Sequence, residues 1–549
     1  MKLLSKILFI SMLFTVTSCL ELDLQDNPNS VPPERADINF FYNTVQLDYG
    51  SFVQNTGDLV STFVRQGAMT GGNTYQNQFT PNTFDFVWRS CYSNLLPDIR
   101  AIQEIANERG LVNNLGIVQT MEAHILMTMV DMFGDIPYSE ALQGTANISP
   151  AADDDADAPR VENDLYFDGN TEAWTKAANT LKIKLLLNLR LTDPATATAG
   201  INEIIASGNF IAAAADDFKG EYGINRDNPD SRHPWYQGAY EEGGPYMSNY
   251  FMWSLLDEKG FEDPRLRYYF LRQDCFTPDE DQFTLQCPTA PRPLHYTGPY
   301  PWCVASDELG YWGRDHGNND GIPPDGQKRT VYGLYPGGGA FDNGVGGTTD
   351  ARCFGSAQNS GTDGAKGQGF TPIILSSYTH FMLAEAALTL NTTGDPRAYL
   401  EEGLRQSFST VKSFESRGSF DFGAAALSVD STFMADSGDS TFIITDTRVD
   451  NYVDFVLNAY DSAGSEDERL GVIIKEYHIA SWGAGMEPYN AYRRTSHPRD
   501  LQPTREPVSG DFPRTNWYPS AYVNQNSVAT QRSDLSGRVF WDTNPDVLN

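Results

Sequence analysis

Residues 115–137 read LGIVQTMEAHILMTMVDMFGDIP, and they carry the clearest helical signal in the chain. Apolar residues recur every three or four positions, as they do on one face of an amphipathic helix. Gly134 and Pro137 then end the pattern, because neither residue readily continues a helix. The stretch predicts a helix whose methionine-rich face is buried in a core and does not line a cofactor. The apolar face consists of Val118, Met121, Ile125, Met129, Met132 and Phe133.

Several other stretches repeat this period and predict further helices. One is expected over residues 170–189, where Asn170 is a good N-cap. Another is expected from about 373 to 388, and the next begins at Asp395–Pro396, a typical start of a helix. A late helix is expected around 470–477. Helices joined by short turns favour a mainly α fold, a tetratricopeptide-like scaffold of helix pairs, although the sequence shows no clean repeat of that length.

Between about residues 219 and 372 the helical period fades, and Gly, Pro, Asn, Asp, Tyr and Trp dominate. A loop-rich insertion of this length in a helical protein is usually functional or disordered. The many aromatic residues argue against disorder, since disordered segments are poor in them. We therefore expect the insertion to carry a binding surface.

The first 18 residues, MKLLSKILFISMLFTVTS, combine a short basic head with an apolar stretch and small residues. This is typical of a secretory signal peptide, which takes no part in the mature fold. Cys19 follows directly, and the junction resembles a bacterial lipobox, which would make Cys19 the lipidated first residue of the mature protein. Glu21 and Asp23 follow this cysteine closely. They resemble a surface-export signal, and the alternative is a solvated tether that happens to be acidic.

The composition excludes some classes of partner. The chain has 549 residues and a formal net charge of -33. Such a charge argues against nucleic acid as a ligand, because the phosphate backbone would be repelled. Hydrophobic residues make up 40% of the chain, which is enough to build a large core. These numbers suit a secreted ectodomain.

Five cysteines remain after Cys19, and their spacing matches no metal-ligand pattern. In an oxidising compartment Cys275–Cys287 and Cys303–Cys353 could form disulfides, but the sequence does not determine the pairing. Cys91 lies in a helical stretch and is expected to be a buried free thiol.

Catalytic signatures are missing from the sequence. There is no G-x-S-x-G, H-E-x-x-H, phosphate-binding loop or dinucleotide-binding loop, and the seven His residues are scattered singly. Carboxylate pairs suited to glycoside hydrolysis are inevitable among 72 acidic residues, and none stands out. No cofactor is expected. Asp153, Asp155 and Asp157 match the first ligand positions of a calcium loop, but Ala158 replaces the glycine such a loop needs.

Four stretches, in this order behind a lipobox, resemble the SusD/RagB family of nutrient-binding outer-membrane lipoproteins, in particular its SusD-like subgroup. They are MVDMFGDIPYSEAL (129–142), WTKAANTLKIK (174–184), FMLAEAA (381–387) and EPYNAYRRT (487–495). Ala491 departs from the family pattern, which has an acidic residue there. In purely physical terms the arginines of the last stretch are expected to pair with carboxylates.

The resemblance implies a tetratricopeptide-like helical fold with a loop-rich ligand face, in one domain over residues 19–549. It implies a lipid anchor in the outer membrane that faces the cell exterior, and a SusC-type TonB-dependent transporter as partner. It also implies capture of an oligosaccharide, or of a peptide, without catalysis. The residues alone leave two alternatives open: a surface glycan-degrading enzyme and a helical-repeat scaffold that binds another protein.

Aromatic rings with polar neighbours mark two candidate ligand clusters in the insertion. Flat rings can stack on the C–H faces of sugars while nearby polar groups bind the hydroxyls. The alternative is that the same rings anchor the insertion on the helices, since Trp is usually well buried. The candidate ligand-binding residues are Trp235, Tyr236, Tyr240, Tyr296, Trp302 and Trp312, with Trp482 as a further candidate.

Overall fold

The computed structural model describes residues 37–72, 74–138, 161, 163–241, 244–271, 291–292, 300–304, 311–318, 330–342, 364–417, 443–505, 510–527, 529–546 and 548. The predicted signal peptide, Cys19, the Asp153–Asp157 run, Tyr296 and the cysteines at 275, 287 and 353 lie outside these residues. Within them, no helix is both long enough and apolar enough to cross a membrane.

The N-terminal third is a set of helices built around the stretch 115–137. Its members are α2 (Ile38–Ser61), α3 (Tyr75–Gln78), η2 (Pro81–Phe84), α4 (Asp85–Arg89), the π-helical turn η3 (Ser90–Leu95), α5 (Leu96–Arg109) and α6 (Val112–Phe133). The predicted helix is α6, and its apolar face is buried. Gly110, with φ of 67°, makes the tight turn between α5 and α6.

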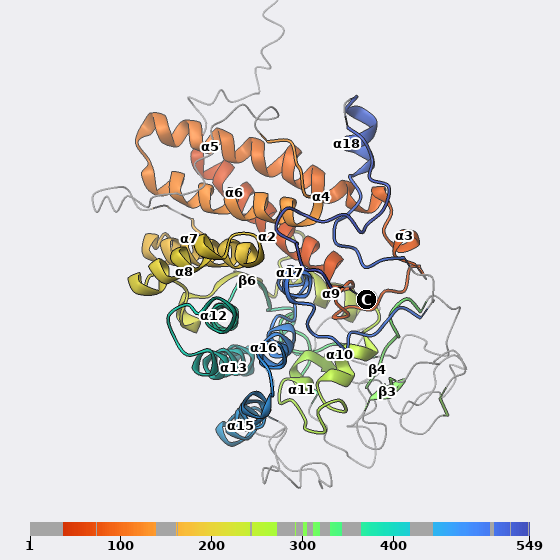
Figure 1. Cartoon of the computed structure of the whole chain (residues 1–549). Helices are drawn as coiled ribbons and strands as arrows, with labels where there is room; N and C mark the ends of the chain where they lie inside the picture. Colours follow the sequence, from red (N-terminus) through yellow and green to blue (C-terminus); the bar gives the residue numbers. More distant parts are fainter. Residues whose placement is uncertain are drawn as a thin grey trace, which may run out of the picture.

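The remaining helices outside the insertion follow along the chain. They are α7 (Thr171–Asn188), η4 (Leu189–Leu191), α8 (Pro194–Ser207), η5 (Ala214–Asp216), α12 (Ser376–Leu390), α13 (Pro396–Lys412), η7 (Ser413–Ser416), α15 (Asp446–Ser462), α16 (Glu466–Ala480), α17 (Met486–Thr495) and α18 (Ser520–Gln525). Those from α7 to α16 continue the stack of pairs. Figure 1 shows α5–α6, α7–α8 and α12–α13 as successive layers, with α15 below them. The mainly α, tetratricopeptide-like prediction is confirmed.

The predicted caps form as expected. The side chain of Asn170 accepts a hydrogen bond from the Ala173 N–H at 3.2 Å, and that of Asp395 accepts one from the Arg397 N–H at 3.1 Å. One boundary differs from the prediction, because Ile373 belongs to a strand and the helix begins only at Ser376. The pairing of that strand explains the difference, since its backbone groups are already bonded to a neighbour.

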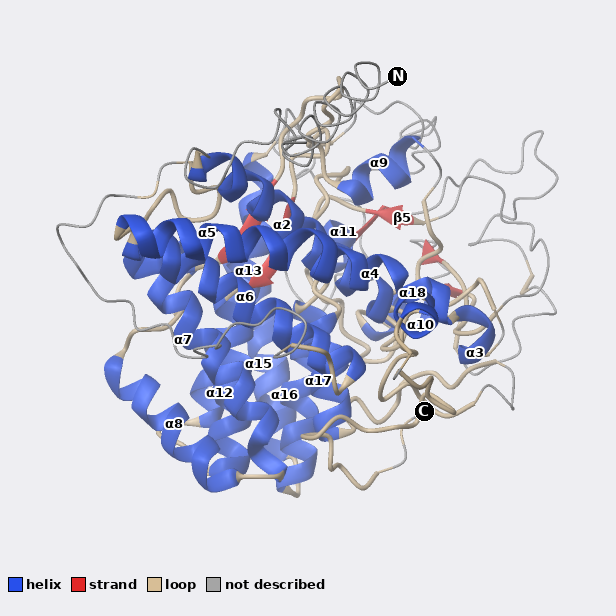
Figure 2. Ribbon diagram, turned by 90° about the horizontal axis from the view of Figure 1, so that it is seen from above, coloured by secondary structure: helices blue, strands red, loops and turns tan. Residues whose placement is uncertain are grey.

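The insertion contains short elements where the sequence predicted only loops. They are β1 (Phe218–Glu221), α9 (Pro234–Glu241), α10 (Asn249–Ser254), α11 (Leu266–Tyr269), β2 (Phe270–Leu271), β3 (Cys303–Val304), β4 (Tyr311–Trp312), β5 (Val331–Tyr332) and β6 (Phe370–Ile374). β1 pairs antiparallel with β6, which brings the two ends of the insertion together. Figure 2 shows α9, β5 and α10 beside the helical stack.

Buried arginines hold the C-terminal helices in place. The guanidinium of Arg494 forms two 2.7 Å bonds to Glu385, as the prediction of a carboxylate partner required. Arg493 behaves differently, because its Nη1 donates to the backbone carbonyls of Asp131 and Arg514 at 2.7 and 2.6 Å. This arginine ties α17 to the end of α6 through backbone oxygens. Sequence patterns do not reveal such partners.

Candidate functional site

A shallow groove of about 600 Å³ runs between the second half of α2 and the segment α3–η2–α4. We call it the α2–α3 groove. Figure 2 shows α2, α4 and α3 on the same side of the molecule. The groove combines polar side chains with aromatic and aliphatic ones and includes no Lys, Arg or His among its described lining residues. These are Asn55, Asp58, Leu59, Thr62, Gln78, Phe79 and Phe86.

Helix geometry explains one wall of the groove. Asn55, Asp58, Leu59 and Thr62 are spaced at i, i+3, i+4 and i+7, so they share one face of α2. The opposite face of α2 is buried in the core and keeps this wall fixed.

A short capped segment forms the other wall. The Thr74 side chain accepts the Asn77 N–H at 3.1 Å and starts α3. Phe79 packs edge-to-face on Phe63, with ring centroids 4.5 Å apart, and this contact holds the wall against the end of α2. Thr80 and Thr83 then form a capping box, which turns the chain into η2.

Gln78 lies directly over two glycines. A Cβ atom at Gly71 would fall 2.4 Å from the Gln78 Oε1, so the side chain keeps this position because Gly71 has none. Oε1 is buried, and neither Oε1 nor Nε2 of Gln78 bonds to any residue that the structure describes. Nε2 therefore remains available as a hydrogen-bond donor at the groove.

Asp58 is the only acidic side chain in the described groove lining. Its Oδ1 accepts hydrogen bonds from Gln54 Nε2 and Trp235 Nε1, both at 2.9 Å. Its Oδ2 bonds to none of the described side chains, and no described cation pairs with it. Burial raises the pKa of Asp58 to about 6, although both hydrogen bonds lower it. At pH 7 the group is therefore mainly ionised and has one oxygen free to accept from a ligand.

Trp235 reaches the groove through its polar edge. Its indole stacks on Tyr332 at 4.1 Å between ring centroids and lies 5.0 Å from the ring of Trp482. Only 7% of Trp235 is exposed. The indole N–H of Trp235 therefore orients Asp58, while its ring packs against Tyr332 and Trp482.

Tyr236 and Tyr240 pack inside the insertion. Their rings stack at 4.6 Å, and the Tyr240 hydroxyl donates to the Tyr332 carbonyl at 2.9 Å. Both are fully buried. This packing favours the anchoring alternative for these two rings.

Trp302 directly precedes β3 and Trp312 lies in β4, and both are buried beside Cys303 and Tyr246. Cys303 is disulfide-bonded, and the cysteines suggested as its partners lie outside the described residues. Cys91 is free and buried, as predicted. The Trp312 Nε1 is buried with no hydrogen-bond partner among the described residues. Ligand binding by these two tryptophans and by Tyr296 stays a prediction.

The β3–β4 hairpin continues into a segment that contacts the α3 wall. The side chain of His316 shares a hydrogen bond with the Tyr75 hydroxyl at 3.1 Å. The Gly317 N–H donates to the Met69 carbonyl at 3.0 Å, just before α3. The predicted tryptophan cluster and the α2–α3 groove are therefore joined through one connected segment.

Sequence reasoning missed every side chain that lines the groove and found only the neighbour Trp235. One signal was available, because Asn55, Asp58 and Thr62 form a polar face on a helix whose other face is aromatic. The contact between α2 and α3 depends on the turn at residues 62–74, which has no period to recognise.

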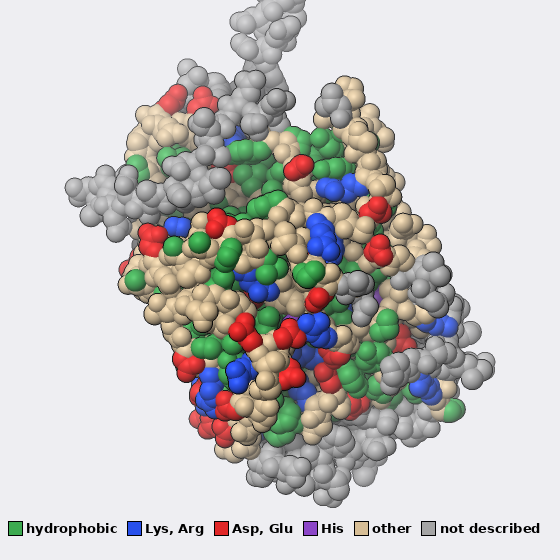
Figure 3. Space-filling model, in the orientation of Figure 1, with side chains coloured by type: hydrophobic (Ala, Val, Ile, Leu, Met, Phe, Trp, Pro, Cys, Tyr) green, Lys and Arg blue, Asp and Glu red, His purple; other side chains and the backbone are tan. Residues whose placement is uncertain are grey.

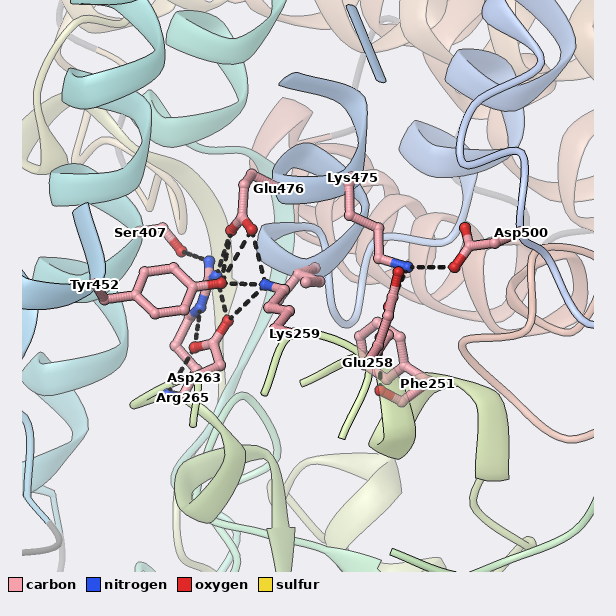
Figure 4. Close-up of polar contacts among 12 residues, drawn as sticks. Phe251, Glu258, Lys259, Asp263, Arg265, Ser407, Tyr452, Lys475, Glu476 and Asp500 are labelled. Atoms are coloured by element: carbon pink, nitrogen blue, oxygen red, sulfur yellow. Dashed lines mark hydrogen bonds and ion pairs between the residues drawn. The ribbon is translucent and has the colours of Figure 1, made fainter. Parts of the chain in front are cut away.

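Buried carboxylates elsewhere in the described chain form ion-pair networks. Figure 4 shows Asp263 and Glu476 on either side of Arg265, at 2.7 and 2.9 Å. Lys259 also contacts Glu476 at 2.7 Å. Burial would raise the pKa of Asp263, but Arg265 outweighs it and the pKa lies below its ordinary value. This network holds the insertion against α16, and none of its members lines the α2–α3 groove.

A second charged group in Figure 4 has the same structural character. Lys475 on α16 contacts Glu258 at 2.6 Å and Asp500 at 3.1 Å. Burial raises the pKa of Glu258. Among the described residues, no group of three or more His, Cys, Asp or Glu side chains is placed to hold a metal ion.

A second cavity of about 360 Å³ lies between α6 and α7. Its walls are mainly aliphatic, with Leu126, Met127, Val130 and Leu185, and Figure 3 shows hydrophobic side chains at this part of the surface. Phe540 stands at its rim and is 67% exposed. The cavity is also lined by Glu122, Asp131, Tyr138 and Asn188, but these polar side chains are bonded to other residues of the protein. The α2–α3 groove therefore suits a polar ligand better.

Two family models match the chain. One, described as SusD-like and "Starch-binding associating with outer membrane", matches residues 34–158 and 150–283. The other, described as "Susd and RagB outer membrane lipoprotein", matches residues 360–537. A comparison with curated proteins finds no match.

Several solved structures share the fold. A chitin-binding protein superposes with a TM-score of 0.64 at 18% identity, covering 92% of this chain and 100% of that one. A chitin-binding SusD homologue from Flavobacterium johnsoniae has a TM-score of 0.60 at 18% identity, with 92% and 99% covered. A SusD/RagB family protein from Bacteroides thetaiotaomicron has a TM-score of 0.63 at 17% identity, with 92% and 99% covered.

Proposed function

The chain belongs to the SusD/RagB family of outer-membrane lipoproteins, and we therefore propose that it captures an oligosaccharide and delivers it to a partner TonB-dependent transporter. The α2–α3 groove is the proposed capture site. The observation that carries this proposal is the groove's lining, which places aromatic rings beside amide, hydroxyl and carboxylate groups. Flat apolar faces and convergent polar groups are what a sugar ring requires.

The solved relatives support a sugar ligand. Two structures of the same fold are described as chitin-binding. A peptide is the second candidate ligand, because the same polar groups could bind a peptide backbone. The proposal includes no catalysis, and it treats the buried carboxylates of Asp263, Glu476 and Glu258 as structural, because each forms an ion pair.

The anchor and the partner complete the proposal. Cys19 carries the lipid, residues 19–549 act as one unit at the exterior face of the outer membrane, and a SusC-type transporter receives the ligand. Acyl chains contribute about 0.8 kcal/mol per buried CH₂, so several of them would keep the protein at the membrane. A Cys19→Ala variant should leave the membrane fraction while its ectodomain keeps its ligand affinity.

The proposed ligand-binding face consists of two surfaces. The α2–α3 groove supplies the primary contacts, and the loop-rich insertion at about 219–372 supplies further rings. Trp302, Trp312 and Tyr296 are proposed there as stacking residues. Trp235, Tyr236 and Tyr240 support this face by packing beneath it.

The proposal is tested by probing a glycan and peptide array with residues 20–549 and titrating the best binder. Phe86→Ala removes a half-buried ring from the groove and should weaken binding about tenfold, equivalent to 1.4 kcal/mol. Phe40→Ala is the matched control, because Phe40 is 76% exposed near the far end of α2. Trp302→Ala and Trp312→Ala test the insertion.

The outcomes separate the candidates. Binding to glycans alone, reduced by Phe86→Ala and not by Phe40→Ala, supports the proposal. Binding to peptides alone would replace the sugar ligand. Turnover of a glycan that is abolished by one carboxylate substitution would establish the enzyme instead.

A further inference from the structure

The charge of the α2–α3 groove restricts its ligand. The described lining has one carboxylate, Asp58, and no cation, in a chain whose formal net charge is -33. A ligand with carboxylate or sulfate groups would meet only like charge here, and no fixed positive charge would compensate for the loss of its hydration. The groove is therefore suited to a neutral ligand.

The free polar atoms of the groove point to a specific group on that ligand. Asp58 Oδ2 is an acceptor without a bond to any described residue, while Oδ1 is already occupied by Gln54 and Trp235. Gln78 Nε2 is a donor that bonds to none of the described residues. A ligand that fills both must offer a donor to the carboxylate and an acceptor to the amide. A secondary amide does this through its N–H and its C=O.

The apolar part of the lining completes the match. Leu59 and Phe86 are half-buried side chains beside these polar groups, and Phe79 lies behind them. A methyl group placed on these side chains is removed from water, which favours binding. Donor, acceptor and methyl group occur together in the acetamido substituent of an N-acetylated amino sugar.

We propose that the α2–α3 groove selects neutral oligosaccharides of N-acetylated amino sugars, and that Asp58 accepts the acetamido N–H while Gln78 donates to its carbonyl oxygen. This inference rests on the proposed oligosaccharide binding and makes it more specific. Asp58 is a specificity residue in this account, and Trp235 positions it through the 2.9 Å bond to Oδ1.

The experiment compares two ligands that differ only at the substituent of interest. N,N′,N″-triacetylchitotriose and cellotriose share the same β-1,4-linked backbone, and the second has a hydroxyl in place of each acetamido group. Calorimetric titration of residues 20–549 should give at least tenfold tighter binding for the acetylated trimer. A trimer of galacturonic acid should not bind.

The variants assign that preference to the groove. Asp58→Asn keeps an oxygen for Gln54 and Trp235 but replaces Oδ2 by an amide donor, so the preference should fall below threefold. Asp48→Asn is the matched control. Asp48 is also a half-buried carboxylate of α2 with a raised pKa. It lies about 15 Å from Asp58 along the helix, at a rise of 1.5 Å per residue. Gln78→Ala, with Gln76→Ala as its control, is a second test if Asp58→Asn does not fold.

The results distinguish a failure of the acetamido assignment from a failure of the proposed oligosaccharide binding. Equal affinity for the two neutral trimers, or an undiminished preference in both Asp58→Asn and Gln78→Ala, overturns the acetamido assignment and leaves sugar capture intact. Binding of the galacturonic acid trimer overturns it as well. If no oligosaccharide of any kind binds to the folded protein, the proposed function fails together with it.

Discussion

The buried pairing of Arg494 with Glu385 joins two helices of the scaffold. Glu385 is fully buried on α12 and accepts both 2.7 Å bonds from Arg494 on α17, while Arg190 contacts it at 3.1 Å. Glu385→Gln leaves buried guanidinium charge uncompensated. We expect a loss of about 3 kcal/mol in the free energy of unfolding, measured with urea.

A surface pair of the same chemistry serves as the control. Arg397 and Asp461 lie 2.9 Å apart and are 41% and 47% exposed. Asp461→Asn should change the free energy of unfolding by less than about 1 kcal/mol. Equal effects of Glu385→Gln and Asp461→Asn would contradict the importance given to burial.

Asp58 predicts a pH dependence with opposite signs for binding and stability. Its pKa of about 6 lies above its ordinary value, so the protonated form favours the folded state. Ligand affinity should fall as pH is lowered from 7.5 to 5, because the protonated group loses its acceptor. The affinity of Asp58→Asn should not depend on pH in this range. If this variant is more stable than the wild type at pH 7.5, the difference in the free energy of unfolding should shrink towards pH 5, because the wild type becomes more stable as Asp58 is protonated. An affinity that is constant between pH 7.5 and 5 contradicts the role of the carboxylate.

At the residue scale, the sequence predicted types of interaction better than partners. It identified Trp235 as important, but it could not show that the indole N–H binds Asp58, 177 residues earlier in the chain. It also predicted a carboxylate partner for both arginines of α17. Only Arg494 has one, since backbone carbonyls satisfy Arg493.

Among the elements, the turn before α3 controls the shape of the groove. Gly71→Ala would place a Cβ 2.4 Å from Gln78 Oε1 and push this flexible side chain aside. We expect several-fold weaker ligand binding with little change in the melting temperature. Gly116→Ala is the control, because it points into open space on α6 and should stabilise the protein by about 0.5–1 kcal/mol. Unchanged affinity in Gly71→Ala would mean that Gln78 is not part of the site.

Periodicity explains which elements could be predicted. α6, α7 and α13 have long apolar stripes or clear caps, and the sequence located them within a few residues. α2 was not predicted, although its buried residues follow a helical period, because polar residues and two glycines interrupt the pattern. α9, α10 and α11 have eight residues or fewer, which is too short for a periodic signal.

For the whole molecule, charge is the dominant property. A net charge of -33 destabilises the compact state through self-repulsion, whereas the main ion pairs are buried and weakly screened. We therefore expect the melting temperature of the ectodomain to rise between 50 and 500 mM NaCl. Over this range the Debye length falls from about 14 to about 4 Å, and the added screening acts mainly on exposed charges. A fall over this range would show that exposed ion pairs contribute more than repulsion.

The family and the fold class could be predicted because their marks are contiguous in the sequence. The groove could not, since it is assembled from α2, from residues 78–86 and from a contact with α9 in the insertion. These segments share no sequence motif, so the groove becomes visible only in the three-dimensional structure.

The central claim is that the α2–α3 groove binds an oligosaccharide, and hydrogen–deuterium exchange with and without the best glycan ligand tests it most directly. The account predicts slower exchange of backbone amides in residues 55–62 and 75–86 when the glycan is bound. It predicts no comparable change at residues 119–130, along the apolar cavity between α6 and α7. Protection confined to that cavity, with the groove unchanged, would contradict it.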